Sequence, residues 1–443
     1  MVSAAEQLAA NLNFSAFAKA DELKKRIWFT LGALLVYRLG TYIPLPGIDP
    51  TVWQKVFNSQ AGGILGMFNM FSGGGIDRMA IFALNIMPYI SASIILQLLT
   101  SVSPKLEALK KEGEAGRKII NQYTRYLTVV LAFFQSYGIA VGLQGAGNVV
   151  TNPGMFFLIS TAITLTGGTM FLMWLGEQIT SRGIGNGISL IIMAGIVAEL
   201  PSALANMLEL GRQGALSTGI ILIVLIMVVA VIAFIVFMER AQRRLLIQYP
   251  KRQVGNKMFE GQSSHLPLKL NTSGVIPPIF ASSLLLLPTT VANFNAGSGP
   301  EWFQWLNTQL GHGRPLFLFL YLALIVFFTF FYTAIVFNPT ETADNLKKHG
   351  GFIPGIRPGE RTAEYIDYVL SRITVPGAIY LAVVCLIPEI LISYAAVPFY
   401  FGGTSLLIVV SVTMDTVSQV QGYLLAHQYE GLIKKSKLRG RRR

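Results

Sequence analysis

The stretch RGIGNGISLIIMAGIVAELPSAL (182–204) decides how many times this chain crosses a membrane. A spanning helix needs about 20 mostly apolar residues, and the apolar run here is short after its glycine-rich start. It suits either a complete span or a segment that enters the membrane and turns back. The choice fixes the side on which every later loop lies.

Ten apolar runs, this one included, divide the 443 residues. They lie near 24–43, 77–99, 123–143, 155–177, 184–204, 217–238, 272–292, 316–337, 375–392 and 402–425. Apolar residues make up 52% of the chain and charged residues 13%, with a mean hydropathy of +0.54. That charged share is about half the share of an average soluble domain. The composition predicts a polytopic membrane protein and excludes a soluble enzyme, a disordered chain and a fibrous repeat.

The basic residues favour ten spans over nine. With ten spans both termini lie on one side, and 30 of the 35 Lys and Arg residues fall on that side. Without the span at 184–204, the seven basic residues of 239–269 would move to the opposite side. Because Lys and Arg concentrate in cytoplasmic loops, we expect ten spans with both termini cytoplasmic. The first 20 residues predict a short surface helix rather than a cleavable signal peptide.

The ten spans form two sets of five. Residues 1–204 hold spans one to five and 217–443 hold spans six to ten, with an outside connection at 205–216. The C-terminal half also carries two large cytoplasmic loops, 239–271 and 338–374, and a basic tail. Because each half has an odd number of spans, a structural repeat between the halves would be inverted.

No group of residues is suited to catalysis or to metal binding. Cys385 is the single cysteine, and the four histidines stand far apart. There is no nucleophile elbow, phosphate-binding loop or metal-ligand spacing, and GIGNG (183–187) does not follow a strand. The sequence predicts no enzyme, no cofactor and no metal. A secondary transporter for a small solute stays open as the alternative, although ionisable residues within the spans are few and Asp415 is the best candidate among them.

Two features of the spans have an ordinary and a functional interpretation. ILGMFNMF (64–71), followed by SGGGID (72–77), is either an interfacial helix or a re-entrant helix with a glycine hinge. The second and seventh spans (77–99 and 272–292) are rich in small and polar residues. They predict either close helix packing or a seam that can move.

A defined turn stands out in the second large loop. FIPGIRPGE (352–360) places Arg357 between Pro354 and Pro358. Prolines and glycines at this spacing favour a stiff turn. Most basic loop residues are explained by topology, but one arginine on a stiff turn indicates a docking point for an acidic or RNA-bearing partner.

Long sequence motifs in both halves of the chain resemble the bacterial SecY family, the channel subunits of the Sec protein translocase. They are FNMFSGG (68–74), MPYISASI (87–94), QYTRY (122–126), GTMFLMWLGEQIT (168–180), RGIGNGIS (182–189), FNPTETADNLKK (337–348), PGIRPGE (354–360) and VPFYFGGTSLLIVV (397–410). The resemblance runs from about residue 20 to residue 435. It implies an all-α polytopic membrane protein, with ten transmembrane helices in two inverted five-helix halves around a central pore, and a short re-entrant plug helix.

The resemblance also implies roles for individual residues. It implies a pore ring of isoleucines, which are Ile86, Ile90, Ile188, Ile192, Ile279 and Ile408. It implies a plug at 64–72, formed by Ile64, Leu65, Met67, Phe68, Met70 and Phe71. The lateral gate would include Ser91, Ser282 and Leu287, and partners would dock at Arg243, Arg244, Lys251, Arg252 and Arg357. Asn85, where the family pattern leads us to expect glycine, Leu287 and Thr340 depart from that pattern.

The family further implies a function, partners and a location. We expect a channel that passes unfolded secretory proteins across the bacterial cytoplasmic (inner) membrane and releases transmembrane segments laterally. The implied partners are the SecE and SecG subunits, the SecA ATPase, the ribosome, signal sequences, nascent secretory or membrane proteins, and membrane lipids. DNA is not among them.

Overall fold

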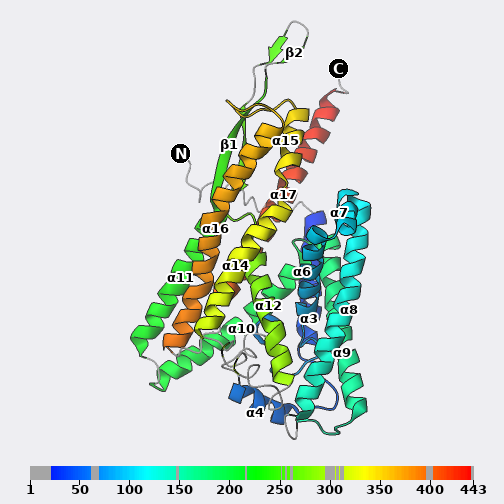
Figure 1. Ribbon diagram of the computed structural model, residues 1–443, viewed down its shortest axis with the longest axis vertical. Helices are drawn as coiled ribbons and strands as arrows, with labels where there is room; N and C mark the ends of the chain where they lie inside the picture. Colours follow the sequence, from blue (N-terminus) through cyan, green and yellow to red (C-terminus); the bar gives the residue numbers. More distant parts are fainter. Residues whose placement is uncertain are drawn as a thin grey trace. The chain divides into compact units, whose positions relative to one another are not determined.

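The computed structural model describes residues 21–60, 69–145, 149–214, 217–250, 252–254, 257–259, 263–294, 305, 309, 314–395 and 403–440. Each of the ten expected spans contains a helix (Figure 1). These helices are α3 (Asp21–Gly40), α6 (Met87–Val102), α8 (Glu114–Gly145), α9 (Met155–Arg182), α10 (Gly187–Arg212), α11 (Thr218–Arg240), α12 (Ile276–Phe294), α14 (Pro315–Val336), α16 (Glu360–Ala395) and α17 (Gly403–Gly440). Three shorter helices are α4 (Pro50–Gln60), α7 (Pro104–Lys111) and α15 (Pro339–Lys348).

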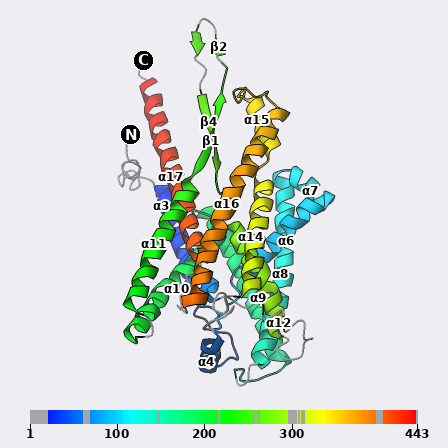
Figure 2. The ribbon, with the colours of Figure 1, turned by 60° about the vertical axis from the view of Figure 1, so that its left-hand side comes forward.

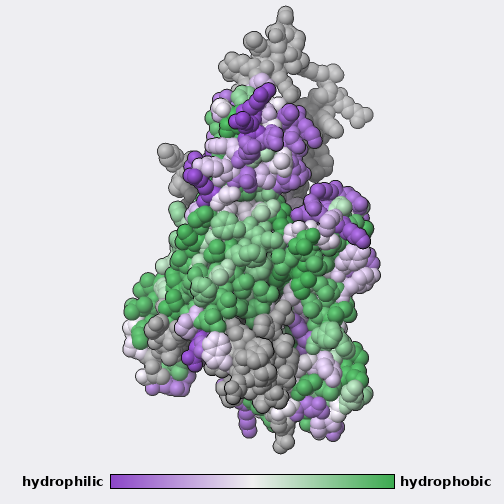
Figure 3. All heavy atoms as spheres, viewed as in Figure 1, coloured by the Kyte–Doolittle hydropathy of each residue, from purple (hydrophilic) through white to green (hydrophobic). Residues whose placement is uncertain are grey.

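The surface of the long helices is that of a membrane protein. Six helical stretches in the described part of the chain are long and apolar enough to cross a membrane. On α11 the exposed side chains include Leu222, Ile223, Ile226 and Val229. On the face of the second unit that carries α14 and α16, Figure 3 shows hydrophobic residues along the middle and hydrophilic residues at the end near α15. Exposed apolar area of this extent is suited to lipid rather than water.

The second expected span starts later than the sequence indicated. We expected it from residue 77, whereas α6 begins at Met87 and the residues before it form a series of turns. Two residues in this approach, Met79 and Asn85, have left-handed backbone conformations with φ of 45° and 48°. Pro88 lies in the first turn of α6. Because left-handed residues interrupt a right-handed helix, the helix forms only after Asn85.

The chain forms two compact units. The first unit is Met1–Asn206, Thr290–Gly299 and Ile408–Arg443, and the second is Met207–Thr289 and Pro300–Leu407. α10 continues to Arg212, so helical structure reaches into the stretch expected as the connection. The division of the chain at 205–216 into inverted halves stays a prediction.

In the first unit, α8 packs against α6 and α9, and α3 lies along α9. An apolar cluster at one end of these helices includes Leu45, Trp53 and Phe157. Trp53 Nε1 donates a hydrogen bond to Ile76 O at 2.7 Å, which ties α4 to the chain before α6. Asp49 lies just before α4, and its hydrogen bonds from Thr51 hold the pKa of its carboxyl below the ordinary value.

In the second unit, α11 and α14 lie along α16 (Figures 1 and 2). The expected loop 239–271 contains an antiparallel ribbon of β1 (Gln242–Gln248) and β4 (Ser263–Lys269). Two short strands, β2 (Arg252–Val254) and β3 (Lys257–Phe259), continue it. Alternate residues of β1 are buried, as the period of two in a strand requires.

Candidate functional site

The first unit contains a buried, glycine-rich turn at residues 71–75. Residues 69–72 are helical, and Gly73 and Gly74 follow with φ of 64° and 80°. Of the expected plug residues, Met70 and Phe71 are described and both are buried. The other four, Ile64, Leu65, Met67 and Phe68, lie outside the described residues.

Three successive carbonyl groups of the turn accept hydrogen bonds from side chains of other segments. The bonds are Asn85 Nδ2 to Phe71 O, Tyr37 Oη to Ser72 O at 3.2 Å, and Arg38 Nη1 to Gly73 O. Two of the donors belong to α3, and the third lies just before α6. The turn is therefore held from two sides by side chains that satisfy its buried polar groups.

Close packing against α10 holds the turn from a further side. A Cβ on Gly73 would lie 2.9 Å from the Cα of Gly195. A Cβ on Gly195 would in turn lie 2.8 Å from Phe71 O and 2.9 Å from Tyr37 Oη. Only glycine fits at both positions, because a side chain on either residue would push the turn away from α10.

Charged groups surround the same turn. A Cβ on Gly74 would lie 2.5 Å from Glu199 Oε1 and 3.3 Å from the Arg78 guanidinium. The guanidinium carbons of Arg78 and Arg38 lie 4.1 Å and 5.1 Å from the centre of the Tyr42 ring, in cation–π contact. We call the turn 71–75 together with Tyr37, Arg38, Asn85, Gly195 and Glu199 the glycine-turn socket. Of these five residues, the sequence singled out only Asn85, because the other four are brought to the turn by the three-dimensional fold.

The expected ring isoleucines occupy related positions on their helices. Ile86 caps α6 and Ile90 lies one turn later; Ile188 and Ile192 have the same spacing at the start of α10. Ile86, Ile90, Ile192 and Ile408 are buried. Ile188 is half-buried, and its Cγ1 would lie 3.1 Å from a Cβ on Gly176 of α9. Pairs four residues apart present one face of a helix.

The remaining ring and gate residues are on α6 and α12. Ser91 is buried on α6, and Ile279 is half-buried on α12. Ser282 is buried, and its Oγ donates to Ile279 O at 2.9 Å, so its hydroxyl is satisfied within α12. Leu287 lies in α12 as well.

In the second unit, the Arg357 turn is built on a packed base. Gly355 and Gly359 on either side of Arg357 have φ of 82° and 110°. The buried Thr362 donates through Oγ1 to Arg357 O at 2.9 Å. Ile356 N donates to Ile353 O at 3.1 Å. These hydrogen bonds fix the backbone of the turn, while the Arg357 side chain is exposed.

The two large loops of the second unit form one structure. Gln248 and Phe352 exchange backbone hydrogen bonds of 2.9 Å and 3.0 Å. Leu245 and Leu268 of the ribbon form an apolar cluster with Ile353 and Ile366. Arg243 and Arg244 are exposed on β1. Arg252 lies in β2, opposite Phe259, and Lys251 is outside the described residues.

The glycine-rich stretch before α10 is hydrogen-bonded to several helices. Three of its amides donate to side chains of three different helices. The bonds are Ile184 N to Thr30 Oγ1 (3.1 Å), Gly185 N to Gln419 Oε1 (2.9 Å) and Gly187 N to Thr180 Oγ1 (2.9 Å). These amides are engaged inside the protein and are not presented to a phosphate group.

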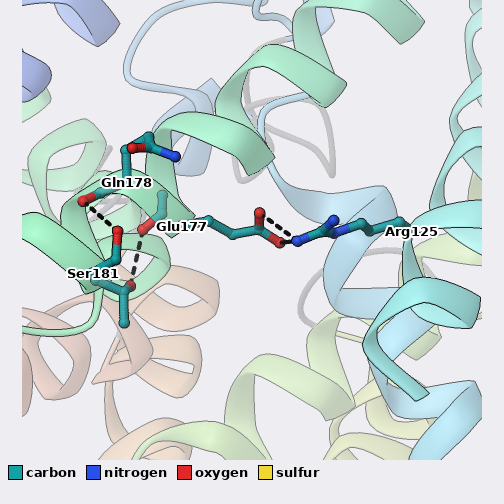
Figure 4. A network of polar contacts seen from close by, with 6 residues as sticks. Arg125, Glu177, Gln178 and Ser181 are labelled. Atoms are coloured by element: carbon teal, nitrogen blue, oxygen red, sulfur yellow. Dashed lines mark hydrogen bonds and ion pairs between the residues drawn. The ribbon is translucent and has the colours of Figure 1, made fainter. Parts of the chain in front are cut away.

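An ion pair joins α8 to α9. Arg125 Nη2 lies 2.7 Å from Glu177 Oε2, and Arg125 Nε donates to Glu177 Oε1 at 3.0 Å (Figure 4). Both residues lie in strings that resemble the SecY family. The two-pronged geometry fixes the register of α8 against α9, although the pair is partly exposed.

Known proteins resemble this chain over nearly its whole length. The SecY family model matches residues 80–417. Protein translocase subunit SecY of Escherichia coli (strain K12) is 57% identical over 430 residues, which cover 96% of this chain and 97% of that protein. The Rickettsia felis subunit is 57% identical over 431 residues, covering 96% and 99%.

Solved structures agree with the fold. A protein-conducting channel has a TM-score of 0.64 at 18% identity, covering 91% of this chain and 93% of that chain. A SecY channel whose plug domain stabilises its closed state has a TM-score of 0.65 at 18% identity and the same coverage. Sec61 from a canine ribosome–channel complex has a TM-score of 0.59 at 17% identity, again covering 91% and 93%.

The fold is therefore that of a protein-conducting channel, a polytopic membrane protein in which each of the ten expected spans contains a helix. The chain belongs to the SecY family.

Proposed function

We propose that this chain is the central subunit of the Sec channel in a bacterial cytoplasmic membrane. It passes unfolded secretory proteins across the membrane and releases transmembrane segments sideways into the lipid. The observation that carries the proposal is 57% identity to translocase subunits over 96% of the chain. Both termini lie in the cytoplasm, in keeping with the excess of basic residues on that side.

The seal of this channel has two layers. The first is a ring of Ile86, Ile90, Ile188, Ile192, Ile279 and Ile408. Branched apolar side chains at a constriction exclude water and ions by dewetting, yet they form no directional bonds with a passing chain. The second layer is the plug at 64–72, whose last two residues, Phe71 and Ser72, belong to the glycine-turn socket.

The sideways exit lies between α6 and α12. Ser91, Ser282 and Leu287 are the gate residues on these helices. The small polar side chains of Ser91 and Ser282 support a polar seam, since such residues favour close helix packing.

The channel is passive, is not itself an enzyme, and takes its energy from partners. The Arg357 turn and the basic β1–β4 ribbon form the docking surface for the SecA ATPase and the ribosome, and SecE and SecG complete the membrane complex. Two fold relatives support a ribosome partner. One is Sec61 of a canine ribosome–channel complex, and the other is a yeast Ssh1 complex bound to the 80S ribosome.

The test is the ion conductance of vesicles that contain the resting channel. In the Ile408→Ser variant we expect conductance to rise by about tenfold or more, the change that about 1.4 kcal/mol in a barrier produces. Ile408→Val keeps the ring apolar and should remain tight. Ile235→Ser, at a fully buried position on α11, controls for general damage to the fold. Equal conductance in Ile408→Ser and the parent protein would remove the ring from this role.

A further inference from the structure

Asn85 has a backbone conformation that few residues adopt. Its φ is 48°, and it is buried immediately before Ile86, the N-cap of α6. Glycine and, less readily, asparagine accept this left-handed conformation. Glycine would thus satisfy the backbone here, and what asparagine adds is a side chain that donates to Phe71 O.

The three donors to the glycine turn differ in the segment that carries them. Tyr37 and Arg38 sit on α3, and both would keep the turn in place if another helix moved. Asn85 instead continues directly into α6. Of these three bonds, only the one from Asn85 links the end of the plug to a helix of the lateral gate.

The hydrogen bond from Asn85 to Phe71 O stabilises the turn only weakly. Asn85 Nδ2 donates to Phe71 O, while Asn85 Oδ1 is buried with no hydrogen-bond partner among the described residues. A buried acceptor left unpaired offsets part of the gain from the donor. The contact is therefore weak enough to break when the start of α6 moves.

We propose that Asn85 is a positioning residue that couples the seal to the gate. In the resting channel it ties the base of the plug to the start of α6, so a shift of α6 withdraws one of the three side chains that hold the turn. The inference rests on the proposed function. It goes beyond that function by assigning the coupling to one hydrogen bond, from Asn85 to Phe71.

The test compares three variants of the full-length protein in its membrane complex. Asn85→Gly keeps the backbone conformation and removes the donor. Asn85→Asp keeps the size of the side chain, and its carboxylate, when ionised, can only accept hydrogen bonds. Thr128→Val removes a buried hydroxyl hydrogen bond on α8, outside the glycine-turn socket, so it serves as the matched control.

Two readouts are needed. The first is hydrogen exchange of the amides of Gly73 and Gly74, which donate within the turn to Met70 O and Asn69 O. Both Asn85 variants should accelerate exchange by about threefold to tenfold, the effect of one lost hydrogen bond, and Thr128→Val should not. The second is resting ion conductance, which should rise by a similar factor in both Asn85 variants and remain near the parent value in Thr128→Val.

The outcomes separate the coupling from its assumptions. Unchanged exchange in Asn85→Gly would overturn the bond itself, whatever the channel conducts. Faster exchange with unchanged conductance would overturn the coupling, as would equal conductance in Asn85→Gly and Thr128→Val. A failure of the pore-ring test with Ile408→Ser would count against the proposed function, whereas the exchange result stands on its own.

Discussion

Two glycine-rich turns, one in each unit, use the same backbone geometry for opposite purposes. Gly73 and Gly74 in the first unit and Gly355 and Gly359 in the second all have positive φ. A Cβ on Gly73 would meet α10 at 2.9 Å, whereas a Cβ on Gly355 would have no atom within 4 Å. The first turn needs glycine for both conformation and space, and the second needs it for conformation alone.

The polar groups of the two turns face different directions. The carbonyls of the first turn point to side chains inside the protein, from Tyr37, Arg38 and Asn85. In the second turn, Thr362 donates a hydrogen bond to the backbone carbonyl of Arg357, while the Arg357 side chain is exposed. A turn whose polar groups are satisfied within the protein suits a seal, and a rigid turn that presents a charge suits recognition.

The largest expected effect is on the buried turn. Gly73→Ala should lower the free energy of unfolding by about 2–5 kcal/mol, because left-handed strain and overpacking against Gly195 add together. The measurement is the denaturation midpoint of the purified complex in detergent. A loss below about 1 kcal/mol would show that α10 can move aside, and the turn would then be no more constrained than the exposed one.

The next effect is functional and concerns the exposed turn. Arg357→Glu should leave the fold and subunit assembly intact and reduce SecA-driven translocation by about tenfold or more, since a pre-organised arginine loses little freedom on binding. ATP-dependent import of a secretory precursor into inverted vesicles measures it.

Lys347→Glu is the matched control for that experiment. Lys347 is exposed near the same turn, with its Nζ 3.8 Å from a Cβ built on Gly359, but it lies on α15 rather than in the turn. We expect a much smaller loss in this variant. Equal losses at the two positions would mean that the surface acts through bulk charge. The Arg357 turn would then have no special role in recognition.

The sequence predicted the helices better than the contacts between them. Apolar runs and basic loops predicted ten spans, and each of these spans contains a helix. Spans can be recognised from the sequence because burial in lipid requires a continuous run of apolar residues. The late start of α6 was missed, since it depends on left-handed residues at Met79 and Asn85. The role of Gly195 was also missed, because a close approach to Gly73 leaves no trace in either residue's neighbours along the chain.

The two functional turns were predictable to different degrees for the same reason. Local residues, Pro354 and Pro358 around Arg357, indicated a stiff exposed turn, and the structure confirms an ordered turn with an exposed arginine. SGGGID (72–77) left a glycine hinge as one of two interpretations, and the structure shows the start of this stretch held by Tyr37 and Arg38 of α3. Glycines alone indicate which backbone angles are accessible, and the surrounding side chains decide whether the turn can move.

The smallest effect should come from alanine in the exposed turn. Gly355 has φ of 82° and free space around its Cα, so Gly355→Ala adds conformational strain without overlap. We expect a loss of about 1–2 kcal/mol in the free energy of unfolding, partly offset because alanine also restricts the unfolded chain. Gly355→Asn should lose less, since asparagine tolerates the left-handed region. Denaturation midpoints measured beside that of Gly73→Ala test the order. If Gly355→Ala proved as damaging as Gly73→Ala, conformation would account for both turns and the space next to Gly195 for neither.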